Sequence, residues 1–495
     1  MVGKRPEWTI LGLRFVGDVF FALFSRLVPK MASALLFIIL MRRSGASVAG
    51  AYSLSTAFLT TGVLLSSLGL EELIVREVAK GTFPSRGYLL NILFIRGILS
   101  LLGYGIVAVI VTGFLHYDMD VKRIILIQSL GMFPESLSSA MFAVFNATGR
   151  LKWVALVSVC VSAFQLSTGG LALWMGAGLE LVIWLLLGGS LLGVVVSVCF
   201  SVRLVRAYST PVGDHDVGQK QPQCWRLDWA FCRQQLRLML PFALTTTLSS
   251  LDLQLDVIVL STLRSIDEVG IYSAARAVML LLSLLPQAFR MSLYPSMAKA
   301  HATSEQELRN VYVQSWWYLT MVGLPLAAGG IILSRPIIHV VYGNATFATS
   351  WALSILMVHL LVGFLYLPST RLMVVSDHQG RLSMLLGLGL GINVAMNVSL
   401  APSLGAVGTA IARSVSSALY FIAVELYVSR HLLRRHGGFL TAIKPILATA
   451  LMVAVVWPLR GQALYVAVPA GVLSYGLALF MVGGVHPPGV FRQQA

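Results

Sequence analysis

Long apolar stretches alternate with short polar connectors along almost the whole chain. A helix needs about 20 apolar residues to cross the hydrocarbon core of a bilayer. Inside that core, backbone N–H and C=O groups must pair within their own segment, which favours helices. The pattern therefore predicts an all-α polytopic membrane protein with about fourteen transmembrane helices. The predicted spans are 18–41, 47–69, 88–115, 122–145, 153–176, 180–203, 238–263, 269–294, 311–334, 347–372, 382–401, 405–429, 441–459 and 463–485.

Composition narrows the class of protein further. Of the 495 residues, 57% are hydrophobic and only 11% are charged, and the mean hydropathy is +0.82. Soluble globular domains do not have this balance. The spans leave no room for a large catalytic domain outside the membrane, so we expect no enzyme and no catalytic residues. The four cysteines form no CxxC pair, and we expect no metal site.

The formal net charge of +16 would suggest nucleic acid as a partner of a soluble protein. In a polytopic membrane protein, Lys and Arg instead set the orientation, because they are retained on the cytoplasmic side. Most of the 36 basic residues, Arg150, Lys152, Arg434 and Arg435 among them, lie on the side of the termini. The pattern predicts cytoplasmic termini and no nucleic-acid partner.

A polar stretch at 206–235 divides the chain. It predicts an N-terminal six-helix bundle at 1–205, a cytoplasmic linker at 206–235, and a C-terminal six-helix bundle at 236–435. The remaining residues, 436–495, are expected to form two additional transmembrane helices and a tail.

The two halves share short sequence landmarks in the same order. AGAYS at 49–53 corresponds to VGIYS at 269–273, TGRLK at 148–152 to QGRLS at 379–383, and GAG at 176–178 to GAVG at 405–408. Six spans separate corresponding elements, so both copies enter the membrane from the same side. This favours a parallel repeat with a pseudo-two-fold axis, as in many transporters. The alternative is chance matching of Gly and Tyr in apolar sequence.

Four stretches within residues 40–430 resemble a known family. They are SGASVAGAYSLSTAFLTTGVLLSSLGLEELIVREVAK, VFNATGRLKWVALVSV, LPFALTTTLSSLDLQLDVIVLSTLRSIDEVGIYSAARAVMLLLSLLPQAFRMSLYPSMAK and NVAMNVSLAPSLGAVGTAIARSVSSALYF. They resemble the Wzx-type polysaccharide flippases of the MATE-like superfamily. The resemblance implies two six-helix bundles around a cavity that opens alternately to either side, with an undecaprenyl-pyrophosphate-linked oligosaccharide as cargo. This sequence departs from the pattern at Arg413, where relatives often carry a small polar residue after GAxGTAIA.

Five basic residues fall inside predicted spans, where each costs about 2.5–3.5 kcal/mol unless it faces a polar cavity or a partner. They are Arg26, Lys30, Arg96, Arg276 and Arg413. Arginine donors suit phosphate oxygens, so these residues are the candidate substrate-binding set of a cationic cavity. The resemblance supports Arg26 and Arg276 by position. Alternatively, Arg26 and Lys30 snorkel to the cytoplasmic interface, and Arg96 and Arg413 pair with Glu135 or Glu425.

Two spans carry polar pairs that are four residues apart and therefore on one helix face. Asp252 and Asp256 lie in the seventh span, and Asn393 and Asn397 lie in the eleventh. Such oxygen-rich faces suit a coupling cation, Na⁺ or H⁺. In the resembling flippases an acid of the seventh span forms a sodium site with polar residues of the eleventh and twelfth, which adds Thr409. Alternatively, the acids balance the arginines and the asparagines join helices.

The leading hypothesis is a flippase of the bacterial cytoplasmic (inner) membrane that serves O-antigen or exopolysaccharide synthesis and needs no cofactor beyond a coupling ion. Its expected partners are the polyprenyl-pyrophosphate-linked glycan, membrane lipids, and the polymerase and chain-length machinery. A lipid II flippase or a multidrug antiporter shares the architecture, although an antiporter for cationic drugs would prefer an acidic or aromatic cavity. A membrane glycosyltransferase or polymerase would need a large outer loop, and the largest predicted one, near 116–123, is too small.

Overall fold

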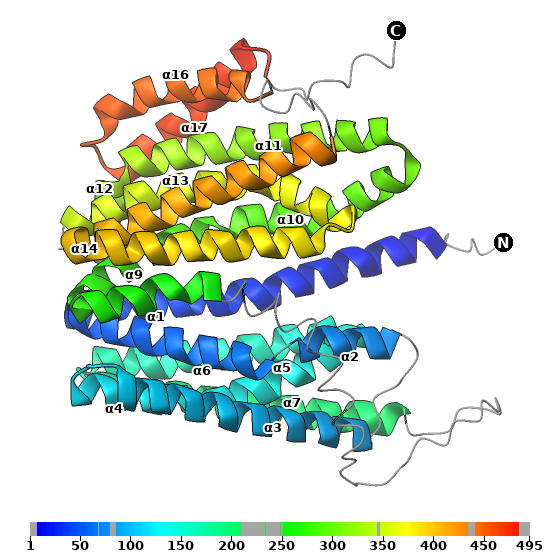
Figure 1. Ribbon diagram of the computed structural model, residues 1–495, viewed down its shortest axis with the longest axis vertical. Coiled ribbons are helices and arrows are strands. Elements are labelled where there is room, and N and C mark those ends of the chain that lie inside the picture. Colours follow the sequence, from blue (N-terminus) through cyan, green and yellow to red (C-terminus); the bar gives the residue numbers. More distant parts are fainter. Residues whose placement is uncertain are drawn as a thin grey trace, which may run out of the picture. The chain divides into compact units, whose positions relative to one another are not determined.

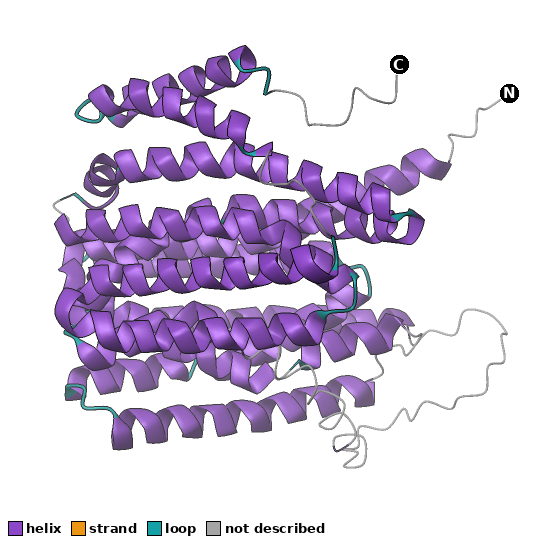
Figure 2. Cartoon of the chain, turned by 45° about the horizontal axis from the view of Figure 1, so that its top comes forward, coloured by secondary structure: helices purple, strands orange, loops and turns teal. Residues whose placement is uncertain are grey.

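The computed structural model describes residues 7–67, 69–79, 86–208, 251–343, 347–433 and 441–484, together with two isolated residues, Arg233 and Leu248. Throughout these ranges the chain is helical and contains no strand (Figure 2). The predicted linker at 206–235 and the first half of the seventh span lie almost entirely outside the described residues. The all-α fold class is confirmed.

The chain divides into two compact units. The first comprises Met1–Arg43 with Ala51–Gln254, and the second comprises Ser44–Gly50 with Leu255–Ala495. The described helices of the first unit are α1 (Glu7–Ser67), α2 (Leu70–Ala79), α3 (Arg86–Val109) with the π-helical turn η1 (Ile110–Phe114), α4 (Met119–Ser129), α5 (Met132–Ala147), α6 (Leu151–Trp174) and α7 (Leu179–Tyr208).

A helical segment at 251–263 belongs to the second unit from Leu255 onward. The further helices of this unit are α9 (Ile266–Leu282), α10 (Leu284–Thr303), α11 (Glu305–Ile332), α12 (Ser334–Tyr342), α13 (Phe347–Val375), α14 (Gln379–His431), α16 (Ile443–Leu459) and α17 (Leu464–Met481).

Two of the helices are double passes that bend at a glycine. Helix α14 has 53 residues, which at 1.5 Å per residue is about 80 Å, more than twice the roughly 30 Å hydrocarbon core. Gly405 in α14 and Gly45 in α1 have positive φ and non-helical ψ. The ribbon of each of these helices reverses direction along its length (Figure 1). Each therefore contains two predicted spans with almost no connector. In the described ranges nine helices are long and apolar enough to cross a membrane, α1 and α14 among them.

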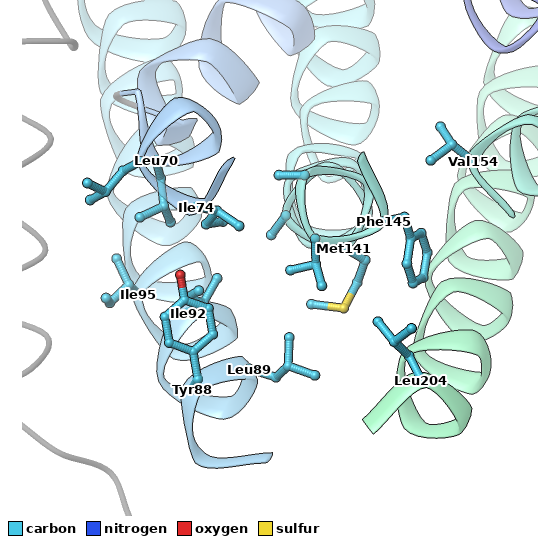
Figure 3. Close-up of a cluster of buried hydrophobic side chains, with 14 residues drawn as sticks. Leu70, Ile74, Tyr88, Leu89, Ile92, Ile95, Met141, Phe145, Val154 and Leu204 are labelled. Atoms are coloured by element: carbon cyan, nitrogen blue, oxygen red, sulfur yellow. The ribbon is translucent and has the colours of Figure 1, made fainter. Parts of the chain in front are cut away.

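Buried apolar side chains hold each bundle together. In the first unit, Leu70 and Ile74 of α2, Ile92 of α3 and Phe145 of α5 belong to one cluster (Figure 3). In the second unit, Trp316 of α11 belongs to another. Many other Leu and Val side chains are exposed, as expected of helices that face lipid.

The repeat has a structural counterpart in a close backbone crossing. A Cβ atom on Gly50 would lie 2.0 Å from the Ile266 carbonyl oxygen, and one on Gly270 would lie 1.9 Å from the Ala46 carbonyl oxygen. Gly50 and Gly270 are corresponding positions of the two copies, and so are Ala46 and Ile266. Such reciprocity is the property of a two-fold contact. The parallel repeat is therefore present in the fold.

Candidate functional site

A buried polar network of the second unit centres on Asp256, in the helical segment 251–263. This carboxylate is 2% exposed. Its Oδ2 accepts a hydrogen bond from the Tyr272 hydroxyl at 2.9 Å and lies 3.6 Å from Arg413 Nε. Its Oδ1 accepts one from Asn397 Nδ2 at 3.2 Å. Helix α9 and both passes of α14 thus supply donors to one buried acid.

The two asparagines of the eleventh span extend this network along α14. Asn397 Nδ2 also lies within hydrogen-bond distance of the Asn393 carbonyl oxygen and side-chain oxygen, at 3.1 and 3.2 Å. Asn393 in turn donates to Ser416 Oγ at 3.2 Å. The predicted ion-coupling residues Asp256, Asn393 and Asn397 therefore lie together. The hydroxyl of Thr409, which is buried, bonds to the Gly405 carbonyl of its own helix, and Asp252, half-buried, lies one turn before Asp256.

Arg413 changes the electrostatics of this cluster. Its side chain is 10% exposed, and a buried guanidinium is costly unless a carboxylate is close. The expected partners Glu135 and Glu425 are not the ones it takes, because it pairs with Asp256. Glu425 instead accepts hydrogen bonds from Tyr312 and Ser369. The contact matches the alternative in which the acids balance the arginines.

Arg96 also pairs with an acid that the sequence analysis did not consider. It is completely buried on α3, and its Nη2 lies 3.1 Å from Glu71 Oε1 on α2. Neither Glu135 nor Glu425 is its salt-bridge partner. This ion pair joins two helices of the first unit.

The other predicted cavity cations differ in burial. Arg26 and Lys30 of α1, in the first unit, are exposed. Arg276 of α9 is half-buried and lies four residues after Tyr272, which places both side chains on one helix face. The structure thus places Arg276 next to the Asp256 network.

Two cations near the ends of predicted spans form a further group in the second unit. Arg290 on α10, which is exposed, and Tyr294, Tyr366 and Tyr420 all lie within electrostatic range of Arg371 on α13. Arg371 is half-buried, and its Nε has no hydrogen-bond partner among the described residues. Two cations held together in this way suit an anionic ligand.

Comparisons with known proteins agree with this architecture. The family model described as "Polysaccharide biosynthesis protein" matches residues 15–301. Two proteins named "Probable lipid II flippase MurJ", from two strains of Helicobacter pylori, are 28% identical over 190 residues and 29% identical over 175 residues. These matches cover 37% and 34% of this chain, and 41% and 38% of the relatives, so the matched region spans about two fifths of their length.

Solved structures match over most of the chain. A lipid II flippase MurJ in an inward closed conformation superimposes with a TM-score of 0.71 at 15% identity, covering 94% of this chain and 98% of the other. An inward-facing multidrug resistance MATE family transporter of the MOP superfamily gives a TM-score of 0.61 at 14% identity, covering 82% and 98%. At these identities the matches establish the fold alone.

Proposed function

The chain belongs to the polysaccharide biosynthesis protein family, and from that premise we propose that it flips a polyprenyl-pyrophosphate-linked oligosaccharide across the bacterial cytoplasmic membrane. The curated relatives are named as probable lipid II flippases, and lipid II is itself a lipid-linked glycan. The excess of Lys and Arg on one side supports cytoplasmic termini. The cargo would feed O-antigen or exopolysaccharide synthesis, with the polymerase and chain-length machinery acting after it.

The observation that carries the proposal is the Arg290 and Arg371 pair with its surrounding tyrosines. A half-buried guanidinium and an exposed one within electrostatic range of each other are both stabilised when an anion binds between them. A pyrophosphate offers two phosphate groups and thus several oxygens to both. Arg276, farther along the same unit, supplies a further cation on the path across the membrane.

Transport in this proposal needs no covalent chemistry. The head group binds the cations from the cytoplasmic side, the two bundles change their relative tilt, and the glycan is released outside while the lipid tail remains in the bilayer. Na⁺ or H⁺ is the proposed source of energy. The predicted Asp256 site carries its own cation in Arg413, which makes it a weaker candidate for the coupling ion than its residue types suggest.

A strain that lacks the gene provides the test. We expect loss of surface glycan and accumulation of the lipid-linked intermediate on the cytoplasmic face, both reversed by the wild-type gene. Arg371→Ala should fail to restore either, whereas Arg203→Ala, which removes an exposed arginine of α7, should restore both.

A lipid II flippase is the second candidate, favoured by the TM-score of 0.71 to such a protein. It would appear in the same strain as lysis with accumulated lipid II and unchanged surface glycan. Altered drug susceptibility with unchanged glycan would instead indicate a multidrug antiporter, and it would overturn the flippase proposal.

A further inference from the structure

The first unit contains a cavity of about 140 Å³, enough for several water molecules. Five helices line it, and none of the predicted site residues does. Its polar lining includes Ser33, Tyr52, Thr56, Gln128, Glu135 and Gln165. A cavity that is both roomy and polar inside a helical bundle is suited to a hydrophilic ligand.

Two of the lining helices, α4 and α5, meet at a break beside the cavity. Helix α4 ends at Ser129 and helix α5 begins at Met132, within what the sequence predicted as a single span. Gln128 lies in the last turn of α4, whose carbonyl end carries partial negative charge, and Glu135 lies in the first turn of α5. Transporters commonly place ion sites at such breaks, where helix ends point at the ion.

Glu135 brings a carboxylate to this cavity without an internal counter-charge. No salt bridge to Glu135 exists among the described residues, whereas Asp256 of the second unit has Arg413. The nearest basic residues along α1, Arg26 and Lys30, are exposed and do not line the cavity. The amino end of α5 lowers the cost of ionising this carboxylate, and a cation bound beside it would lower that cost further.

Other lining groups offer oxygen atoms to the same space. Gln128 is 6% exposed, and its Oε1 has no hydrogen-bond partner among the described residues. Gln165 is held by its nitrogen, which donates to the Leu186 carbonyl at 3.0 Å and to Ser190 Oγ at 3.3 Å. Its oxygen is therefore the end left for a ligand. Carboxylate, amide and hydroxyl oxygens are the ligands that hard cations take.

We propose that the Glu135 cavity binds one alkali-metal cation. A single carboxylate balances a single positive charge, and the neutral oxygens of Gln128 and Gln165 replace part of the hydration shell. The cavity volume accommodates the remaining waters. The inference concerns binding by the first unit, and it stands whichever cargo the protein carries.

The test uses the full-length protein purified in detergent, at constant pH and ionic strength, in NaCl, KCl or choline chloride. A ligand that binds the folded state raises the melting midpoint in a saturable manner. We expect a higher midpoint in Na⁺ or K⁺ than in choline, and binding of one ²²Na⁺ or ⁴²K⁺ per chain. Glu135→Gln should lose both responses. Glu180→Gln is the matched control, because its carboxylate pairs with Arg123 at the first turn of α7, and it should keep both.

A second variant keeps the proposal testable if Glu135→Gln does not fold. Gln128→Met keeps the volume of the side chain, removes one oxygen, and should raise the cation concentration at half-saturation several-fold. A wild-type midpoint that does not distinguish the alkali ions from choline would overturn the proposal, even if it changed with pH. A Glu135→Gln protein that still binds one alkali cation would also overturn it.

Discussion

Asp256 and Arg413 neutralise each other inside the second unit, with 3.6 Å between the carboxylate Oδ2 and the guanidinium Nε. The two residues are far apart in the sequence, and both are almost completely buried. Tyr272 and Asn397 supply further hydrogen bonds to the acid. The ion pair therefore occupies the place in which the sequence suggested a coupling ion.

A charge-removal series tests this ion pair. Removing one partner of a buried pair leaves the other uncompensated and costs about 3–5 kcal/mol, whereas replacing both partners costs far less. We expect Asp256→Asn and Arg413→Gln each to lower the melting midpoint and the yield of folded protein. The double variant should recover most of the loss, and the measurement is thermal unfolding of detergent-purified protein.

If Asp256 and its neighbours instead bind a coupling ion, we expect a different outcome. In that case Asp256→Asn alone would fold with the wild-type midpoint, and only its response to Na⁺ would disappear. That result would show that the folded protein tolerates a buried Arg413 without the Asp256 carboxylate.

The spans and the repeat could be predicted because they depend on local pattern. Apolar runs of sufficient length mark helices in lipid whatever their neighbours are, and the glycine at 50 and 270 is needed for the same backbone approach in both copies. One pair of sequence landmarks, TGRLK and QGRLS, nevertheless does not align residues that are structurally equivalent. The left-handed residue before α6 is Gly149, and its counterpart before α14 is Asp377, three residues before the glycine of QGRLS.

The hydrogen bonds at these two turns establish that correspondence. Arg150 N donates to the Phe145 carbonyl, and His378 N donates to the Met373 carbonyl, both at 2.8 Å. Asp tolerates the left-handed conformation better than most non-glycine residues. Alignment on the shared GRL letters therefore misses an equivalence that depends on backbone geometry.

The partners of buried charges could not be predicted from the sequence. Spacing identifies residues on one helix face, but it does not say which helix packs opposite that face. Arg413 thus takes Asp256 rather than Glu135 or Glu425, and the cavity around Glu135 is formed by residues of five helices. Arg371 could not be predicted as a site residue for another reason. A cation near the end of a span is also what sets the orientation of a membrane protein, so its position does not indicate a ligand.

The Arg96 and Glu71 pair predicts a loss of stability without a specific loss of transport. Arg96 is completely buried, while the Glu71 side chain is 44% exposed. Glu71→Gln would leave a buried cation without its carboxylate, so we expect a lower melting midpoint. The surviving folded protein should transport normally per molecule. Normal stability with abolished transport would instead assign Arg96 to the cargo path.

The contact between Gly50 and Gly270 makes a sharper prediction about stability. A methyl group on either glycine would lie about 2 Å from a carbonyl oxygen of the opposing backbone, and backbone cannot move aside as a flexible side chain can. We expect Gly270→Ala and Gly50→Ala each to reduce strongly the yield of monodisperse protein in size-exclusion chromatography. Gly97→Ala, on α3 with no atom within 4 Å of the added methyl, is the matched control and should be neutral or stabilising by up to about 1 kcal/mol. Equal yields for all three variants would mean that the two helices do not approach this closely, and the two-fold contact would have to be abandoned.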